Sequence, residues 1–214
     1  LCAHYDTRPY PDEERDRQRA RGVFVGANDG ASGVAVLCEL ANQMKSIRCG
    51  YGVDFVLFDA EELIFEDHSM EDFFLGSTYF AQQYANDTTR NFIYHAAILL
   101  DMVGDRHLEL FREKNSMRYA RRMVDEVWAV AKEAGIKEFR HDRPRHEVRD
   151  DHLPLNEIAK IPAIDIIDFD YPSVNTPVRQ QYWHTQKDIP ENCSPVALAR
   201  VGVVIRSWLE RIRA

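Results

Sequence analysis

Acidic and imidazole side chains follow the short apolar runs of this sequence. The run over 53–58 is followed by Asp59 and then by two adjacent glutamates, Glu61 and Glu62. Others lie beyond further apolar runs or in a glycine-rich turn: His4, Asp6, Asp29, Asp101, Asp150, Asp151, His152 and His184. Nitrogen and carboxylate oxygen ligands suit zinc in a catalytic site, where one position stays open for water or substrate. These residue types therefore indicate a metal-assisted reaction, in which one glutamate binds a cation and its neighbour moves a proton.

Mutual repulsion among the carboxylates supports this hypothesis. If Asp29, Glu62 and Asp101 converge in a medium of low dielectric constant, a divalent cation is needed to offset their charges. Taken singly, each residue has a structural explanation: an N-cap for Asp29, a solvated surface for the paired glutamates, and a hydrogen-bonded structural role for His4. Their common placement at predicted strand ends is what favours a site.

The elements that position these residues alternate between strands and helices. Three apolar runs are typical of strands buried on both faces: 53–58, 96–100 and 161–167, the last of which is interrupted by Asp165. Apolar residues recur about every 3.6 positions over 33–44 and 117–134, which predicts helices. Ser194 and Pro195 predict the N-cap and first position of a last helix that runs to Ile212. Alternation of this kind favours an α/β sandwich with a largely parallel sheet, which binds ligands beyond the carboxyl ends of its strands.

Composition narrows the class of protein further. The 214 residues suit one domain, and a hydrophobic content of 45% can form a sizeable core. The net charge of −8 disfavours nucleic acid as a partner, because phosphate contacts need clustered Lys and Arg. The basic run over 15–22 follows acidic residues and is interpreted as a mobile polar loop. No apolar run is long enough to span a membrane.

Several features of the sequence leave the surroundings of this domain open. The cysteines fit no zinc-binding or redox spacing, so their disulfide state and the compartment stay undetermined: Cys2, Cys38, Cys49 and Cys193. Residues 1–3 read as the end of a strand, which predicts that 1–214 is one catalytic domain lacking upstream elements. The stretches 7–22 and 169–181 lack a clear period, and long loops of this kind are often functional.

The motifs, taken in order, resemble those of a known enzyme superfamily. HYD, GANDGASG, DAEE, LLDMVGD and YWHT occur in the order seen in zinc aminopeptidases of the co-catalytic α/β type. The segments EDFFLGSTYFA, DDHLPL and IPAI are closer to one branch, the glutaminyl cyclases. The resemblance runs from His4 to about Val204, and it implies a three-layer sandwich with a mixed, largely parallel central sheet. It also implies an exported bacterial enzyme, periplasmic or secreted, that acts on peptide or protein N-termini.

This resemblance implies roles for individual residues. Both branches share three zinc ligands, which correspond to Asp29, Glu62 and His184. Two further residues match the remaining ligands of a two-zinc aminopeptidase: His4 and Asp101. Glu61 corresponds to the general acid/base, and in cyclases Asp101 instead joins Glu61 and Asp150 in a proton relay. Trp183 matches the aromatic residue beside the substrate, and Asp6 would orient His4.

The sequence also departs from the pattern of animal cyclases. Asp165, Asp67 and Arg149 stand where that pattern has His, Trp and Gln, and its disulfide is not reproduced because Cys2 is offset and Val34 occupies the partner position. Two reactions stay open: a one-zinc cyclisation of N-terminal glutamine to pyroglutamate, and a two-zinc hydrolysis of the N-terminal peptide bond. A non-catalytic binding module on the same fold is a third hypothesis.

Overall fold

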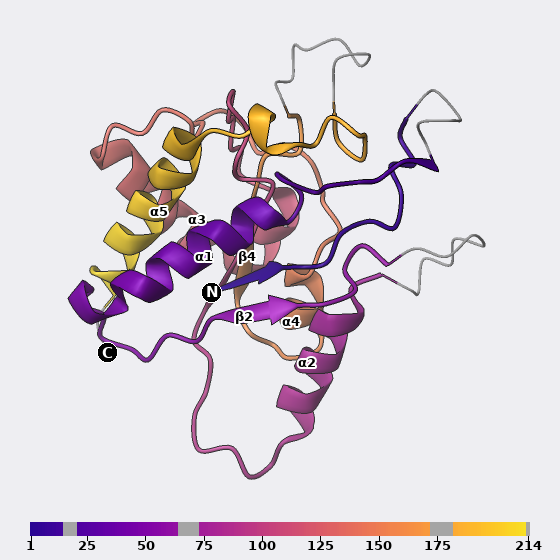
Figure 1. The fold of residues 1–214 in the computed structure, drawn as a ribbon. Helices are drawn as coiled ribbons and strands as arrows, with labels where there is room; N and C mark the ends of the chain where they lie inside the picture. The colour runs from indigo at the N-terminus through magenta and orange to yellow at the C-terminus, as the bar shows by residue number, and fades with distance from the viewer. Residues whose placement is uncertain (15–20, 64–72, 172–181, 213–214) are drawn as a thin grey trace.

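Four parallel strands form the sheet in the described part of the chain, which comprises 1–14, 21–63, 73–171 and 182–212 of the computed structural model (Figure 1). The sheet order is β2-β1-β3-β4, from the strands β1 (Cys2–His4), β2 (Val56–Phe58), β3 (Ala97–Asp101) and β4 (Ala163–Ile167). His4 pairs with Phe58, and Asp101 pairs with Ile167, so neighbouring strands end at the same level. The predicted largely parallel sheet is confirmed, and it brings the carboxyl ends of the strands to one edge.

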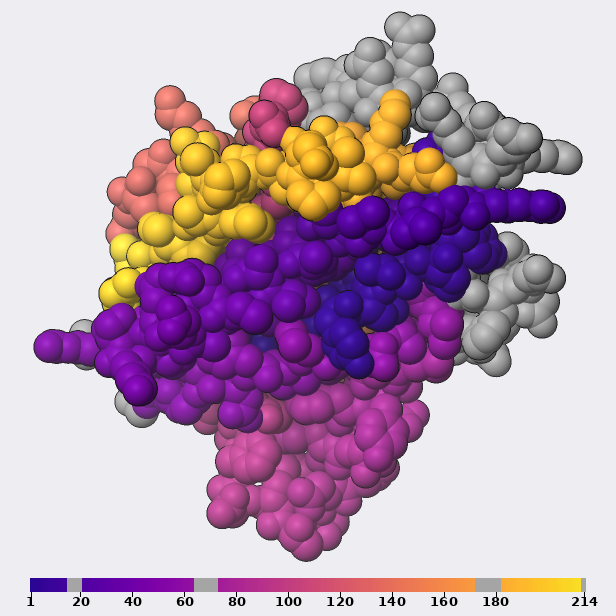
Figure 2. Space-filling view, viewed as in Figure 1, coloured from indigo at the N-terminus to yellow at the C-terminus, as the bar shows by residue number. Residues whose placement is uncertain are grey.

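Helices cover both faces of the sheet, which confirms the three-layer prediction (Figure 1). One layer contains α1 (Ala31–Gln43), α3 (Lys114–Glu133) and α5 (Pro195–Leu209). The other contains α2 (Leu75–Asn86) and α4 (His152–Glu157). Side chains alternate between the layers as strand geometry requires: Ile98 and Leu100 pack with the first layer, whereas Leu99 packs against Leu155 of α4. Figure 2 shows α5, in yellow, lying along α1, in purple.

Most predicted elements are present, with shifted ends. Helix α3 begins at Lys114 because the Glu113 carboxylate accepts the backbone N–H groups of the first turn. Helix α5 begins at Pro195 after the Ser194 cap, as predicted, but it ends at Leu209 rather than Ile212. Helices α2 and α4 and two short 3₁₀ turns, Met44–Ser46 and Pro190–Asn192, were not predicted from periodicity.

The prediction for the run over 53–58 is wrong in two respects. The strand is shorter, Val56–Phe58, and Leu57 is 45% exposed, so this strand is not buried on both faces. Strand β2 pairs only with β1 among the described strands and lies at the edge of their sheet. An edge strand leaves one side chain facing solvent even when its sequence is fully apolar.

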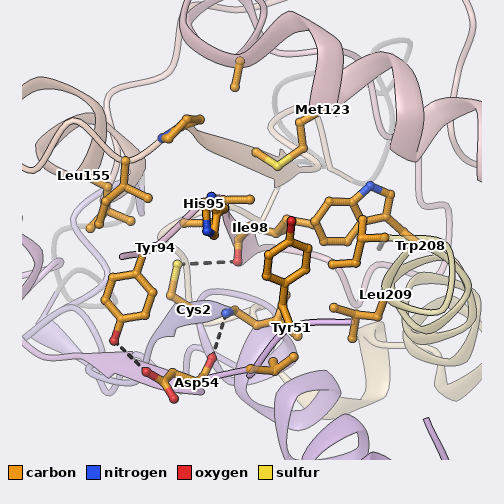
Figure 3. Close-up of a pocket in the computed structure, with 18 of the residues that line it drawn as sticks. Cys2, Tyr51, Asp54, Tyr94, His95, Ile98, Met123, Leu155, Trp208 and Leu209 are labelled. Atoms are coloured by element: carbon orange, nitrogen blue, oxygen red, sulfur yellow. Dashed lines mark hydrogen bonds between the residues drawn. The ribbon is translucent and has the colours of Figure 1, made fainter. Parts of the chain in front are cut away.

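A large cavity of about 1410 Å³ lies at the amino ends of the strands, away from the predicted site (Figure 3). Its lining includes residues from the starts of β1, β2 and β3, among them Cys2, Val56 and Ile98. The Leu1 amino group there donates a hydrogen bond to the backbone oxygen of Asp54 at 2.8 Å. The lining is mostly apolar and offers no cluster of metal ligands among the described residues.

Three other sequence-based predictions have different outcomes. The four cysteines all lie in described ranges and are free thiols. No helix within those ranges has the length and apolar character needed to cross a membrane. The mobile loop predicted for 15–22 lies largely outside the described residues, as does Asp67. A single domain with elements preceding residue 1 stays a prediction.

Candidate active site

The predicted metal ligands meet at the carboxyl edge of the sheet. His4 and Asp101 are the last residues of β1 and β3, and Glu62 lies in the loop that follows β2. Asp29 lies in the turn before α1, and His184 lies in the loop that precedes α5. All five side chains are buried. Residues separated by as many as 180 positions therefore form one site, as the strand-end argument predicted.

Two sets of ligands share the Asp29 carboxylate. His4 Nε2 lies 3.2 Å from Asp29 Oδ1 and 3.1 Å from Asp101 Oδ1. His184 Nε2 lies 3.3 Å from Asp29 Oδ2 and 3.1 Å from Glu62 Oε1. Ligand atoms on a tetrahedral zinc ion are roughly 3.3 Å apart, given bonds of about 2.0–2.1 Å. Both sets therefore fit zinc in donor type and spacing, and the two oxygens of Asp29 could bridge a pair of ions.

The positive charge of protonated imidazoles and the negative charge of carboxylates offset each other in these ligand sets. Burial raises the pKa of Asp101 to about 6. Burial would also raise the pKa of Asp29, but hydrogen bonds with His184 and His4 lower it below its ordinary value. Burial would lower the pKa of His184, but its contacts with Asp29 and Glu62 raise it to about 9. A divalent cation can take the place of these imidazole protons, since a ligating histidine is neutral and a ligating carboxylate is ionised.

The turn before α1 is shaped to present Asp29. A Cβ at Gly30 would lie 2.3 Å from His4 Nε2, so only glycine fits against the imidazole. The carboxylate of Asp188 accepts the backbone N–H groups of Asn28 at 2.6 Å and Asp29 at 3.1 Å. Gly30 is the N-cap residue, and no side chain caps α1. The capping explanation for Asp29 is therefore wrong, and its carboxylate is free to face the histidines.

Two aspartates lie behind the histidines. Asp6 Oδ1 is 3.5 Å from His4 Nδ1, and Asp12 Oδ1 is 3.6 Å from His184 Nδ1. In each imidazole the far nitrogen faces a carboxylate, so Nε2 is the atom that faces the ligand sets. This arrangement fixes the orientation of a ligating ring. Sequence reasoning found Asp6 but missed Asp12, which lies in a loop with no periodic signal.

Arg8 is a second residue that sequence reasoning missed. Its Nη1 lies 3.1 Å from Glu62 Oε2, and its Nε and Nη2 donate to both oxygens of Asp12 at 2.7 and 2.8 Å. Glu62 therefore contacts His184 through one oxygen and Arg8 through the other. The only sequence signal for Arg8 was its position two residues after Asp6. Arginines are also frequent in the basic run that follows, so Arg8 did not stand out.

Glu61 differs from Glu62 in its surroundings. It is buried but belongs to neither ligand set. Burial raises the pKa of Glu61 well above its ordinary value, and the charge of Glu62 raises it further. The backbone turns sharply before the pair, because Ala60 has a left-handed φ of 57°. The two neighbours thus have different environments: one is suited to bind a cation, and the other is suited to hold a proton.

The third predicted catalytic residue, Asp150, lies at the start of α4 with His152 and near Asp165 of β4. Burial raises the pKa of Asp150 well above its ordinary value, and the charge of Asp101 adds to this effect. Strand register places Asp165 opposite Leu99, hence on the same face of the sheet as Asp101. The charge of Asp101 raises the pKa of Asp150, and the charge of Asp150 raises the pKa of Glu61, so the three carboxyl groups influence one another electrostatically.

Trp183 lies against the imidazole of His184. The two rings stack with centroids 3.8 Å apart and planes 26° apart. Phe169 extends this aromatic surface, with its ring centroid 5.7 Å from that of Trp183. Trp183 is half-buried, so part of its ring stays accessible. Trp183 therefore lies beside a candidate ligand, and its contact with a substrate stays a prediction.

Known proteins that are similar to this chain include glutaminyl cyclases. A glutaminyl-peptide cyclotransferase of Bothrops jararaca is 25% identical, over 98% of this chain and 60% of its own length. The chain thus spans about three fifths of the length of that curated relative. The crystal structure of Fimbriiglobus ruber glutaminyl cyclase is 39% identical, with a TM-score of 0.88, over 98% of this chain and 69% of that chain.

Peptidases are similar as well. A leucine aminopeptidase precursor from Bacteroides thetaiotaomicron is 32% identical, with a TM-score of 0.86, over 99% of this chain and 71% of that chain. The model of peptidase family M28 matches residues 1–209, which include every residue of both ligand sets. From that match and the geometry of the strand ends, the chain belongs to peptidase family M28.

Proposed function

We propose that the protein is a zinc-dependent glutaminyl-peptide cyclotransferase, which converts an N-terminal glutamine to pyroglutamate and releases ammonia. The observation that carries this proposal is the group of buried carboxyls Glu61, Asp101 and Asp150 beside a complete set of zinc ligands. Cyclisation replaces one C–N bond of the substrate by another and needs a group that takes up and returns a proton, but it needs no water nucleophile. The likeness to solved glutaminyl cyclases supports the same reaction.

The chain's own residues have distinct tasks in this reaction. Asp29, Glu62 and His184 would hold one zinc ion, which supplies Lewis-acid polarisation of the side-chain amide carbonyl. Glu61 accepts a proton from the α-amine as its nitrogen bonds to the amide carbon. Glu61 then returns a proton to the amide nitrogen, whose bond to that carbon breaks to release ammonia.

The surroundings of Glu61 suit both proton transfers. Its raised pKa lets Glu61 hold a proton between the two steps at neutral pH. Asp101, with a pKa of about 6, is a second group that can carry the proton, and Asp150 completes the relay. The aromatic face of Trp183 borders the site and offers an apolar surface for the substrate.

Hydrolysis of the N-terminal peptide bond is a second candidate, and one specific observation favours it. His4, Asp29 and Asp101 form a further ligand set that shares Asp29 with the first, which is the arrangement expected for two bridged zinc ions. In this reaction Glu61 would deprotonate a water molecule rather than an amine. Asp101 would act as a ligand and could no longer hold a proton.

A substrate assay on the protein in its full natural length separates these reactions. Cyclisation predicts stoichiometric ammonia from Gln-peptides and no free leucine from Leu-peptides. Free leucine with no ammonia would overturn the cyclase proposal in favour of hydrolysis. The zinc held around Asp29, measured as the difference in zinc content between the wild type and Asp29→Ala, should be near one ion per chain for cyclisation and near two for hydrolysis. Absence of both zinc and turnover would instead favour the binding-module hypothesis.

A further inference from the structure

A third group of potential ligands lies at the start of α4 and in the middle of β4. One ligand atom from each of Asp150, His152 and Asp165 lies within 4.8 Å of the other two. All three side chains are at least 98% buried, with exposures of 2%, 0% and 1%. Helix α4 packs on β3 and β4, so this group is enclosed between the helix and the sheet. It shares no residue with the two ligand sets around Asp29.

Apart from Asp150 Oδ1, the polar atoms of this group lack hydrogen-bond partners among the described residues outside it. No described residue beyond the group hydrogen-bonds to either carboxylate oxygen of Asp165 or to Oδ2 of Asp150. Neither ring nitrogen of His152 has a hydrogen-bond partner among the described residues, and its Nε2 lies 3.5 Å from Glu113 Oε2. Buried carboxylates without donors are costly unless a proton or a cation neutralises them.

Most of the charged side chains that act on this group are negative, among them Asp101, Asp151 and Glu113, whereas His4 is a positive one. Asp151 is buried directly beside the group, and the Glu113 carboxylate already accepts backbone N–H groups of α3 and of Val148. The imidazole of His152 is the one group of the three that can carry a positive charge. Two carboxylates and one imidazole, all buried, therefore resemble a binding site more than a solvated cluster.

We propose that Asp150, His152 and Asp165 bind a divalent transition-metal ion of the zinc type, separate from any ion held by Asp29. Two carboxylates and one imidazole suit zinc, whereas magnesium prefers oxygen ligands and retains several waters. The ligand atoms are within 4.8 Å of one another and need only a small approach to reach the roughly 3.3 Å spacing of a tetrahedral site. Three protein ligands leave one position for a water molecule.

The ion would define what Asp150 does, and this part of the inference rests on the proposed function. Asp150 Oδ1 accepts the backbone N–H of Asp151 at 2.5 Å, so the unpartnered Oδ2 is the atom left to coordinate. A coordinated Asp150 stays ionised. It would then act as a fixed anion in the relay, while Glu61 and Asp101 carry the proton.

A zinc count in variants that lack the other sites tests this proposal without any measurement of activity. Asp29 belongs to both of the other ligand sets, so Asp29→Ala should remove their ions. We expect Asp29→Ala, equilibrated with zinc and dialysed, to retain one ion per chain by mass spectrometry. The double variant Asp29→Ala/Asp165→Asn should retain none. Asp165→Asn keeps the side-chain volume, so the fold is expected to persist.

Two results would overturn the proposal. The first is an Asp29→Ala protein that retains no zinc. The second is a double variant that binds as much zinc as Asp29→Ala alone. In both cases a proton shared by Asp150 and Asp165, rather than a metal ion, would neutralise the group. If the double variant does not fold, Asp29→Ala/His152→Gln replaces it, with the same expected loss of one ion. Because Asp29→Ala removes the proposed catalytic zinc, these outcomes are independent of whether the enzyme is a cyclase or a peptidase.

Discussion

Replacement of Asp6 by asparagine tests whether one carboxylate positions both the His4 ring and the paired glutamates. Asp6 Oδ1 lies 3.5 Å from His4 Nδ1 and accepts the backbone N–H of Glu61 at 3.2 Å. Asp6 Oδ2 accepts the backbone N–H of Glu62 at 3.0 Å. Burial would raise the pKa of Asp6, but the contacts with His4 and these N–H groups lower it, so Asp6 is ionised at neutral pH.

The size of the effect follows from these contacts. Asparagine keeps the shape of the side chain and one carbonyl oxygen. One of the two N–H groups therefore loses its acceptor, and the other has a neutral acceptor in place of a charged one. A hydrogen bond to a charged group contributes about 1.5–3 kcal/mol, so we expect a decrease of about 2–3 kcal/mol in the free energy of unfolding. Loss of an orienting contact behind a ligand typically reduces metal affinity by about 10–100-fold. The variant should therefore fold, bind zinc more weakly and turn over more slowly.

The measurements are the zinc dissociation constant by competition with a chelating dye, urea unfolding, and turnover of a Gln-peptide. Asp59→Asn is the matched control, because Asp59 lies in the loop of the paired glutamates and accepts the N–H of Ala60 at 3.0 Å but is exposed. The control should bind zinc like the wild type. Zinc affinity of Asp6→Asn within about twofold of the wild type would refute the idea that Asp6 organises the site.

Three further predictions follow. Glu61→Gln should reduce turnover by about 10²–10⁴-fold with zinc retained, whereas Glu62→Ala should lose zinc; equal zinc loss in both would contradict the separate roles. Gly33→Ala should lower the free energy of unfolding in urea by about 1–3 kcal/mol or more, because the added methyl would lie 2.1 Å from a backbone oxygen of β3. The control Gly52→Ala should not lower it, because no atom lies within 4 Å of the added methyl. Glu113 has its pKa lowered from 4.5 to about 2: burial opposes the shift, and the imidazole and N–H groups around the carboxylate cause it. The stabilisation from the Glu113 carboxylate is therefore complete above about pH 4.5 and is lost as pH falls through about 2. The metal-free wild type should be more stable than Glu113→Gln by about 3 kcal/mol at pH 7, and this difference should shrink by pH 2. A difference that does not change with pH would contradict the assignment.

The sequence predicted the inward-facing part of the site because its signals are local. Apolar runs mark strands, and parallel strands end at one edge, so His4, Asp101 and the paired glutamates could be placed together from spacing alone. Asp29 was harder, because an aspartate in a glycine-rich turn is usually an N-cap. The resemblance assigned Asp29 as a zinc ligand, and the structure removes the capping alternative, because Gly30 occupies the cap position and the imidazole of His4 packs against that glycine.

The supporting residues could not be predicted for a physical reason. Arg8 contacts Glu62 across 54 positions, and Asp188 holds the backbone of Asn28 across 160. Neither Arg8 nor Asp188 lies in a helix or strand with a period, and arginine and aspartate in loops are usually solvated. Contacts of this kind depend on how distant loops meet, which one-dimensional patterns do not record. The exposure of Leu57 was missed for the same reason, since an apolar run does not show whether its strand lies at an edge.

The choice between one zinc ion and two depends mainly on Asp101. Its carboxylate can bind a second ion together with His4, or it can hold the proton that Glu61 delivers, but it cannot do both, because a ligating carboxylate must be ionised. Burial raises the pKa of Asp101 to about 6, so a proton competes with a second zinc ion near neutral pH. Asp29 and Glu62 would serve either reaction unchanged. The same side chains can therefore support cyclisation or hydrolysis, and we expect the protonation of Asp101, rather than the ligand set as a whole, to favour one reaction over the other.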